Sequence, residues 1–379
     1  MLISEKNLKI ALVHDFLVNF GGAERVLLTL SEMFPDAPIY TLLYDQEKMG
    51  KYFPEKSIRP SFLQNFPKFL RRNYKWLLPF LPTAPESFDL REYDLIISSS
   101  GAWTKGIVTR LDTIHLAYIH SPMRFVWDYN EKYLRDERQE KIGFLVRPFL
   151  TYLRLWDKLA ADRPDYLIAN SKYTQKRIEK YYRRDSEVIY PPVGVKSESA
   201  NGSSTSIREA ELSQGKYFLI VSRLSAYKKV AEAVEAFNGS GLPLVVAGTG
   251  KQEKYLRSIA KDNIKILGWV SDEKRAELYR NARAFIFPGL DDFGLAPAEA
   301  MAAGVPVVAI RRGGVLEIVE EGKTGEFFDA ATPDAIADAV KRFIAKENDY
   351  DKEYIQKSTE KFSEERFKRE LEEFLEKII

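Results

Sequence analysis

Short, almost uninterrupted apolar runs alternate with stretches of helical periodicity along the first half of the chain. The first run, residues 9–13, is followed by two glycines and then by apolar residues at helical spacing from Val26 to Met33. This pattern predicts a strand, a tight turn and a helix. Runs that are apolar at every position are typical of strands covered on both faces. Further strands of this kind are predicted at 94–98, 115–119, 166–169 and 188–190.

A second series of the same kind follows a connecting stretch. Residues 196–215 are rich in Ser, Asn, Gly and Glu and hold few large apolar residues, so they are predicted to be an exposed connection. Strands are then expected at 217–221, 242–247, 264–267, 284–287 and 305–310. Two such series predict an α/β protein with two doubly wound, Rossmann-like domains, at 1–195 and 216–363, and with ligands in the cleft between the domains.

The stretch 364–379 has the pattern of an amphipathic helix. Its apolar residues share one helical face, and they are Phe367, Leu371, Phe374, Leu375 and Ile378. In the expected fold this C-terminal helix crosses back to the first domain.

Composition narrows the class of protein. A chain of 379 residues exceeds what one hydrophobic core holds, and 45% hydrophobic with 30% charged residues exclude disorder of the whole chain. The 57 basic and 55 acidic residues give a net charge of +2, so no nucleic-acid partner is expected.

The absence of cysteine excludes disulfides and thiolate chemistry and favours a cytoplasmic location. Neither a secretory signal pattern nor an apolar stretch of ~18–20 residues is present, so no transmembrane helix is expected.

Two cations follow the predicted strand 217–221. Arg223 and Lys228 stand five residues apart at the carboxyl end of that strand. Paired cations at such a position suit a pyrophosphate. On spacing alone, a pair of solvated surface charges is an equally good interpretation.

The string Asp-Asp-Phe-Gly-Leu-Ala-Pro-Ala-Glu, residues 291–299, follows another predicted strand and opens a helix at about Pro297. Backbone N–H groups at a helix start favour an anion such as a diphosphate. The carboxylates of Asp291 and Glu299 suit paired hydroxyls, as on a ribose or a hexose. Taken alone, each acid is also a common residue at a helix start.

This string resembles the nucleotide-sugar site of family-4 retaining glycosyltransferases with the GT-B fold, in which two acidic residues flank Phe-Gly. The family usually has Glu where this chain has Asp291. The resemblance covers essentially the whole chain, with further matches at 21–24, 169–171, 221–228, 245–250, 268–270 and 313–317. The run 120–127, His-Ser-Pro-Met-Arg-Phe-Val-Trp, is similar to mannosyltransferases of bacterial surface-polysaccharide assembly.

The resemblance implies a role for each matching residue. Arg223 and Lys228 would hold the donor diphosphate, while Glu299 would bind the ribose. Val270 would contact the base through its backbone. Asp291 and His120 would touch the transferring sugar, and these two residues with Arg223 and Lys228 are the expected catalytic set. The remaining expected donor-binding residues are Gly21, Gly22, Ser171, Phe293, Gly294 and Leu295.

The three histidines differ in the positions that the predicted strands give them. His14 and His120 are expected at strand ends, where they suit a cleft, whereas His115 inside a strand is better explained as a structural residue. No general base is assigned, because in retaining transfer the leaving phosphate can accept the proton of the acceptor.

No metal or other cofactor is expected. The Asp-x-Asp string at 349–351 lies in a charged stretch remote from the motifs, and two cations with a helix terminus can replace a metal ion.

Residues 56–85 form a basic and aromatic segment without an acidic residue. Such a segment suits an anionic lipid surface, although a pair of core-packing helices or a single-stranded nucleic-acid site has a similar pattern. The expected membrane or acceptor contacts are Lys68, Arg71, Arg72, Lys75 and Trp76. The leucines at 70, 77, 78 and 81 are expected to enter the lipid interface.

The leading interpretation is a retaining, metal-independent glycosyltransferase. By resemblance, the first domain would bind a glycan or polyprenyl-linked acceptor, and the second would bind a nucleotide sugar, with GDP-mannose favoured. The enzyme would be cytoplasmic and peripherally associated with the inner face of the cell membrane. The alternatives are a UDP-sugar-dependent transferase of the same fold, a non-catalytic nucleotide-sugar or glycan-binding protein, and a membrane-bound assembly scaffold.

Overall fold

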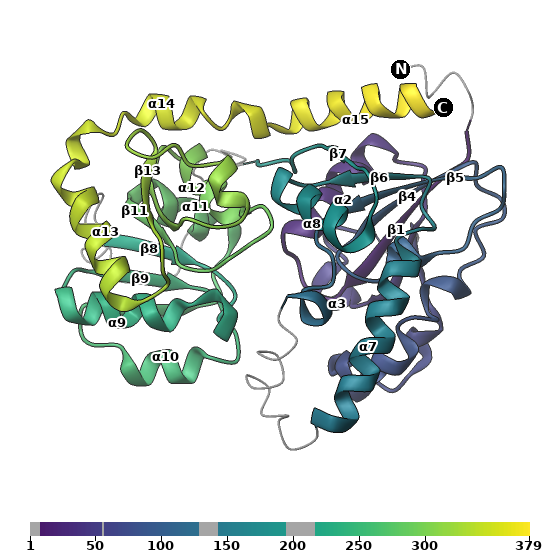
Figure 1. The fold of residues 1–379 in the computed structure, drawn as a ribbon, viewed down its shortest axis with the longest axis horizontal. Helices are drawn as coiled ribbons and strands as arrows, with labels where there is room; N and C mark the ends of the chain where they lie inside the picture. Colours follow the sequence, from purple (N-terminus) through teal and green to yellow (C-terminus); the bar gives the residue numbers. More distant parts are fainter. Residues whose placement is uncertain (1–7, 55–56, 129–142, 195–216) are drawn as a thin grey trace. The chain divides into compact units, whose positions relative to one another are not determined.

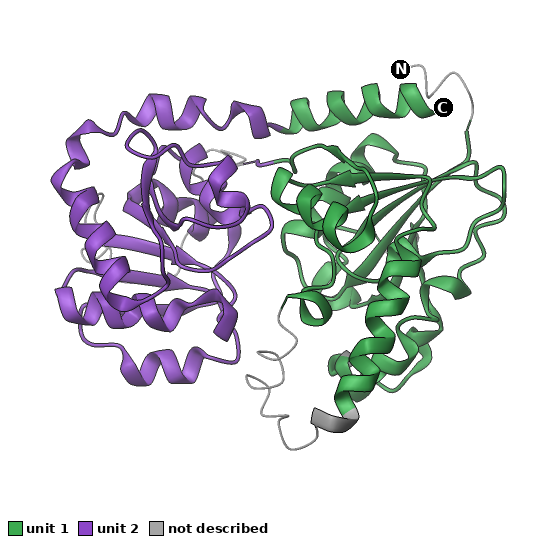
Figure 2. Ribbon diagram, in the orientation of Figure 1, with its two compact units in different colours: residues 1–192, 364–379 green, residues 193–363 purple. Residues whose placement is uncertain are grey.

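The chain forms two compact units. The computed structural model describes residues 8–54, 57–128, 143–194 and 217–379. One unit consists of residues 1–192 and 364–379, and the other consists of residues 193–363 (Figure 2). The predicted connection at 196–215 lies outside the described residues.

The first unit is built on a sheet of seven parallel strands (Figure 1). The strand order is β3-β2-β1-β4-β5-β6-β7. Strands β2 and β3 therefore lie on one side of β1, and β4 to β7 lie on its other side, so the strand order reverses between β1 and β4. Ligands of doubly wound sheets bind at such a reversal. The strands are β1 (Ile10–Leu17), β2 (Ile39–Tyr44), β3 (Ile58–Pro60), β4 (Leu95–Ser100), β5 (Ile114–Ile119), β6 (Tyr166–Ala169) and β7 (Glu187–Val188).

Helices of the first unit cover this sheet and extend beyond it. In α2, Val26, Leu27 and Leu30 form the buried stripe that the helical spacing predicts. The helices are α2 (Gly22–Met33), α3 (Gln46–Met49), α4 (Lys68–Arg72), α5 (Arg124–Trp127), α7 (Gly143–Ala160), α8 (Lys172–Tyr182) and α15 (Glu364–Ile378). Short 3-10 helices lie at Phe62–Asn65, Tyr74–Phe80, Pro85–Ser87 and Thr104–Gly106.

Helix α15 belongs to the first unit although it follows the second in the chain. Phe367, Leu371 and Leu375 are buried in the core of the first unit. The ring of Phe367 meets that of Tyr118 edge-on, with 5.9 Å between centroids. The guanidinium of Arg366 donates a hydrogen bond of 2.7 Å to the carbonyl of Tyr190. The expected return of this helix to the first domain is confirmed.

The second unit has a sheet of six parallel strands in the order β10-β9-β8-β11-β12-β13, with its reversal between β8 and β11. The strands are β8 (Tyr217–Val221), β9 (Leu244–Ala247), β10 (Ile264–Gly268), β11 (Ala282–Phe287), β12 (Val307–Ile310) and β13 (Gly325–Phe328). The helices are α9 (Val230–Ser240), α10 (Glu253–Ile259), α11 (Asp272–Asn281), α12 (Leu295–Ala302), α13 (Pro333–Ala345) and α14 (Lys352–Lys357). Short 3-10 helices lie at Ala226–Lys228, Gly314–Glu317, Glu347–Asp349 and Glu360–Phe362.

The predicted α/β class with two doubly wound, Rossmann-like units is confirmed, with three departures in detail. Strands β2, β3 and β13 were not predicted. Strand β1 runs on to Leu17, so His14 lies within the strand and not at its end. Helix α12 begins at Leu295 and not at Pro297, because Gly294 starts it from a left-handed backbone with φ of 102° and a proline is tolerated in a first helical turn. Among the described residues, none of the helices is long and apolar enough to span a bilayer.

Candidate active site

In the first unit, three polar side chains meet near the carboxyl ends of β4 and β5, where the middle of β1 runs alongside β4. His14 on β1 is the register partner of Ser99 on β4, and His120 follows the last residue of β5. Ser99 Oγ lies 3.1 Å from His14 Nδ1 and 2.7 Å from His120 Nε2. On the other side of its ring, His14 Nε2 lies 3.5 Å from a carboxylate oxygen of Glu24 in the first turn of α2. The two histidines that suited a cleft are thus joined through one serine hydroxyl.

The next residue of β1, Asp15, holds the loop that follows β4. One of its carboxylate oxygens accepts hydrogen bonds from the backbone N–H groups of Gly101 and Ala102, at 2.8 and 2.7 Å. The other accepts from the N–H groups of Trp103 and Thr104, at 3.0 and 2.8 Å, and from the Thr104 hydroxyl at 2.8 Å. A buried carboxylate with five donors is a strong anchor, because hydrogen bonds to a charged acceptor are stronger than neutral ones. Asp15 therefore fixes the position of the loop 101–104, next to the sheet reversal of the first unit.

The predicted donor-binding residues of the first unit lie at helix starts. Gly21 precedes α2, which begins at Gly22. Ser171 is buried and caps α8, because its hydroxyl accepts a hydrogen bond from the backbone N–H of Thr174 at 3.0 Å. This cap gives Ser171 a structural role of its own. The third histidine, His115, is fully buried beside the Ser98 hydroxyl at 2.8 Å, and burial lowers its pKa to about 3, in keeping with a structural residue.

In the second unit, the structure brings Lys228 and Asp291 together at the sheet reversal. Lys228 closes the 3-10 helix after β8, and Asp291 lies in the loop after β11. The ammonium of Lys228 donates to both carboxylate oxygens of Asp291, at 2.6 and 2.5 Å. Arg223 is exposed, and its guanidinium donates to the hydroxyl of Tyr227 at 2.7 Å. Arg223, Lys228 and Asp291 therefore share one edge of the second sheet, whereas His120, the other predicted sugar contact, belongs to the first unit.

Close backbone packing positions the loop 289–295. A Cβ atom added to Gly314 would lie 2.1 Å from the carbonyl oxygen of Asp292, so no other residue fits there without displacing the loop. The N–H of Gly314 donates to the carbonyl of Asp291 at 3.1 Å. The ring of Phe293 is buried and packs edge-on against Phe362, so any contact of Phe293 with a donor is through its main chain. Gly294 and Leu295 present the N-terminus of α12 beside it.

Glu299 is buried one turn into α12, and neighbouring residues fix its carboxylate. The hydroxyl of Tyr279, on α11, donates to one of its oxygens at 2.9 Å. The guanidinium of Arg275 lies 3.7 Å from the same oxygen. Neither partner can be found from the sequence alone, because nothing in the spacing of α11 distinguishes them. Val270 follows β10 and is half-buried.

If Glu299 binds the ribose, as the resemblance implies, the change Glu299→Gln is expected to weaken the binding of free nucleotide about tenfold, because an amide replaces one carboxylate acceptor. Isothermal titration measures this affinity directly. Tyr279→Phe serves as a matched control that loosens the carboxylate but leaves its charge, and it should have the smaller effect. An unchanged affinity in the Gln variant would remove Glu299 from the ribose site.

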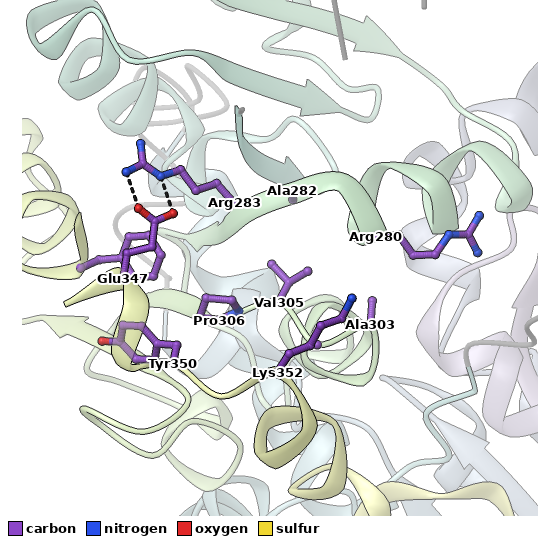
Figure 3. Close-up of a pocket in the computed structure, with 11 residues that line it drawn as sticks. Arg280, Ala282, Arg283, Ala303, Val305, Pro306, Glu347, Tyr350 and Lys352 are labelled. Atoms are coloured by element: carbon purple, nitrogen blue, oxygen red, sulfur yellow. Dashed lines mark hydrogen bonds and ion pairs between the residues drawn. The ribbon is translucent and has the colours of Figure 1, made fainter. Parts of the chain in front are cut away.

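One hollow of the second unit lies away from these residues. It has a volume of about 230 Å³ and is lined by residues at the start of β11 and just before β12, among them Ala282, Val305 and Pro306 (Figure 3). Arg283 at its rim is already paired with Glu347 through two hydrogen bonds. Ligands of doubly wound sheets bind at the carboxyl ends of strands, and this hollow lies at the amino ends.

The basic and aromatic segment is partly buried. Leu77 and Leu81 are almost fully buried in a core cluster with α7. The expectation that these two leucines enter a lipid interface is therefore wrong, because both are buried inside this cluster. Lys68 is paired with Glu47 of α3 at 2.9 Å, so an acid from another part of the chain does oppose this segment. Trp76 and Phe69 remain exposed, at 74% and 65%.

The described residues contain no group of three or more His, Asp or Glu side chains placed to hold a metal ion. The charged residues at the reversal of the second sheet include Arg223, Lys228 and Asp291. Asp349 and Asp351 lie at the surface, where Asp351 caps α14 by accepting from the N–H groups of Glu353 and Tyr354.

Known proteins share both sequence and fold with this chain. It is 24% identical to the alpha-1,3/1,6-mannosyltransferase ALG2 of Dictyostelium discoideum, over 91% of each chain. It is 35% identical to a GDP-mannose-dependent alpha-mannosyltransferase of Corynebacterium glutamicum, over 29% of this chain and 26% of the relative. The crystal structure of Anabaena HepE in complex with UDP and glucose superposes with a TM-score of 0.65, over 98% of this chain and 100% of HepE, at 19% identity.

Two family patterns follow each other along the sequence. The family described as Glycosyltransferase Family 4 matches residues 20–196, and the family described as Glycosyl transferases group 1 matches residues 204–361. The shared fold is the GT-B arrangement of two Rossmann-like units. Because the two patterns together match most of the chain, this protein is an enzyme that belongs to the glycosyltransferases.

Proposed function

We propose that the protein transfers mannose from GDP-mannose, with retention of anomeric configuration, to a glycan on a polyprenyl-linked carrier. The observation that carries this proposal is the pairing of Lys228 with Asp291 at the carboxyl edge of the second sheet, with Arg223 on the same edge. Support for mannose comes from the relatives, since both ALG2 of Dictyostelium and the enzyme of Corynebacterium are mannosyltransferases by name.

The charges at this edge suit the departure of a diphosphate. Negative charge develops on the leaving phosphate as the glycosidic bond breaks, and preorganised cations stabilise it. The ammonium of Lys228 and the guanidinium of Arg223 would supply that charge, with the N-terminus of α12 beside them. The carboxylate of Asp291 would accept hydrogen bonds from sugar hydroxyls. The leaving phosphate would then take the proton of the acceptor hydroxyl, so that no basic side chain is needed for this step.

A panel of nucleotide sugars tests the donor. The protein is titrated with GDP-mannose, GDP-glucose, UDP-glucose and UDP-galactose, and slow donor hydrolysis is followed for each. We expect GDP-mannose to bind most tightly and to be the one that is hydrolysed. If a UDP-sugar is the only compound hydrolysed, the donor is that UDP-sugar and not GDP-mannose. Binding of a nucleotide sugar without any turnover, in the presence of lipid-linked acceptors, would instead favour a nucleotide-sugar-binding protein.

Transfer is proposed to proceed without a metal ion. The cations of Arg223 and Lys228 occupy the role that a divalent ion has in other transferases. Activity is therefore expected to survive excess EDTA at its full rate, measured with the donor found in the panel. A loss that manganese or magnesium restores would contradict this.

Peripheral binding to an anionic membrane is part of the proposal. In addition to the exposed rings of Trp76 and Phe69, the surface of the first unit exposes Tyr152, Leu155 and Leu159 of α7, by 51%, 62% and 63%. The spacing of these three residues places them on one face of the helix. The opposite face of α7 packs in the same core cluster as Leu77 and Leu81. Exposed aromatic and aliphatic residues next to cations are typical of surfaces that enter a lipid interface.

Charge reversal of Arg71, Arg72 and Lys75 to Glu is expected to abolish sedimentation with anionic liposomes, because each cation near such a surface contributes about 1 kcal/mol. Reversal of Lys176, Lys180 and Arg183, three exposed cations of α8 and its end, is the matched control and should leave binding intact. Binding of the wild-type protein should fall with salt. If the wild-type protein does not bind anionic liposomes at low salt, the membrane proposal is wrong, and the donor assignment is unaffected.

A further inference from the structure

The hydroxyl of Ser99 is the junction of a chain of side chains in the first unit. Ser99 is fully buried, and its oxygen contacts one ring nitrogen of each of two histidines, His14 Nδ1 at 3.1 Å and His120 Nε2 at 2.7 Å. The chain continues through His14 Nε2 to Glu24, 3.5 Å away. The histidines and Glu24 come from three elements, β1, the end of β5 and the start of α2, which the sheet reversal brings together.

The number of hydrogens on these side chains limits the hydrogen-bonding arrangements that Glu24, His14, Ser99 and His120 can adopt. A hydroxyl has one hydrogen to donate and two lone pairs that accept, so Ser99 donates to at most one of the two histidines, and the other donates to Ser99. The carboxylate of Glu24 is an acceptor only, so His14 Nε2 carries a hydrogen in either case. Two arrangements use the hydroxyl as a donor and an acceptor at once. With His14 neutral, its Nδ1 accepts from Ser99, and Ser99 accepts from a hydrogen on His120 Nε2. With His14 protonated, its Nδ1 donates to Ser99, and Ser99 donates to His120 Nε2.

We propose that Ser99 is a positioning residue that couples the protonation of His14 to the tautomer of His120. When one proton enters at His120 Nδ1, the hydrogen on His120 Nε2 passes to the Ser99 oxygen, and the former hydroxyl hydrogen passes to His14 Nδ1. The net change is one added proton, with His14 now an imidazolium beside the Glu24 carboxylate. His120 ends as the neutral tautomer that carries its hydrogen on Nδ1.

Other charged groups around His14 are committed elsewhere. The neighbouring carboxylate of Asp15 is turned to the loop 101–104 and has five donors of its own. Among the described residues, Glu24 on α2 contacts the His14 ring directly, and His120 contacts it through Ser99. The nearby Ser98 belongs to a separate pair with the buried His115. The proposed coupling runs from Glu24 through His14 and Ser99 to His120.

The consequence for transfer rests on the proposed function, in which His120 contacts the transferring sugar. A hydrogen on Nδ1 makes that nitrogen a donor to a sugar oxygen, whereas its absence makes the nitrogen an acceptor. The proton on His14 would thus set which hydrogen bond His120 offers to the donor substrate. Ser99 and Glu24 would thus influence the hydrogen bond between His120 and the sugar, although neither residue is expected to touch the sugar.

The coupling is measured in the full-length protein by NMR of ¹⁵N-labelled histidine. The chain holds only three histidines, and the variants His14→Gln and His115→Gln assign the ring signals. In the wild-type protein, we expect the hydrogen of His120 to move from Nε2 to Nδ1 over the same pH interval in which His14 becomes protonated. If His120 keeps one tautomer throughout that interval, the proposal is wrong, whatever the enzymatic activity proves to be.

Three variants at two serines of the same strand sharpen the test. In Ser99→Ala, the tautomer of His120 should no longer follow His14, and kcat should fall roughly tenfold to a hundredfold with little change in KM. Ser98→Ala removes the hydroxyl beside His115 and is the matched control, in which the coupling should persist. Ser99→Thr retains the hydroxyl and should restore the coupling. Coupling that survives in Ser99→Ala, or that is lost equally in Ser98→Ala, would overturn the role of Ser99.

Discussion

Replacing Lys228 with alanine is expected to lower kcat by about 10²–10³-fold, the usual cost of removing one preorganised charge or donor from a transition state. The structure gives two reasons. The ammonium is held at 2.5 and 2.6 Å by Asp291, so its position is set before substrate arrives. Its removal also leaves the carboxylate of Asp291 without this partner, beside the expected path of a departing diphosphate. Arg223→Ala should act in the same direction, because the guanidinium stands on the same edge of the sheet.

The adjacent residue offers a matched control. Lys229 carries the same charge but pairs with Glu232 on α9, so Lys229→Ala should leave kcat within about twofold of the wild-type value. The measurement is steady-state transfer or donor hydrolysis, with circular dichroism to show that the fold is kept. Near-normal rates in both Lys228→Ala and Arg223→Ala would show that the diphosphate is bound elsewhere.

Asp15→Asn is expected to lower the free energy of unfolding of the first unit by roughly 2–6 kcal/mol. The amide group replaces one carboxylate oxygen, and two backbone N–H groups of the loop 101–104 then lack an acceptor, at about 1–3 kcal/mol each. Urea unfolding followed by tryptophan fluorescence measures the loss. The readout suits this unit, because it holds four of the five tryptophans, at 76, 103, 127 and 156.

The control for this variant is Asp36→Asn, since Asp36 is exposed in the turn after α2. Its midpoint of unfolding should stay that of the wild-type protein. Equal midpoints for Asp15→Asn and the control would mean that water replaces the lost acceptor, and that the loop does not depend on Asp15.

Most of the sheets could be predicted because their strands are apolar at nearly every position. The run Tyr217–Val221 is a strand at those bounds, since a strand covered on both faces leaves few polar residues to blur its ends. Strand β3, at Ile58–Pro60, could not be found in the same way. It is three residues long at the edge of the sheet, two of them exposed, and an edge strand with one covered face has no continuous apolar run.

The candidate site could be predicted where it lies within one motif, and not where it depends on register. Lys228 and Asp291 were identified from local strings, and the structure shows them in contact. Ser99 was not identified, because a serine in a strand acquires its meaning only from the residue opposite it. That residue is His14, 85 positions away in the sequence, and only the parallel pairing of β1 with β4 aligns the two.

The return of α15 to the first unit has a consequence for the order of folding during synthesis. The chain enters and leaves the second unit at neighbouring residues, where the N–H of Val193 donates to the carbonyl of Phe362 at 2.8 Å, so the second unit is an insertion within the first. Domains generally fold as units while the ribosome extends the chain. The second unit can therefore close its core before Phe367, Leu371 and Leu375 have been made, whereas the first must wait for them. The part of the protein that is synthesised first is completed last, and until then the apolar surface that these residues cover stays exposed.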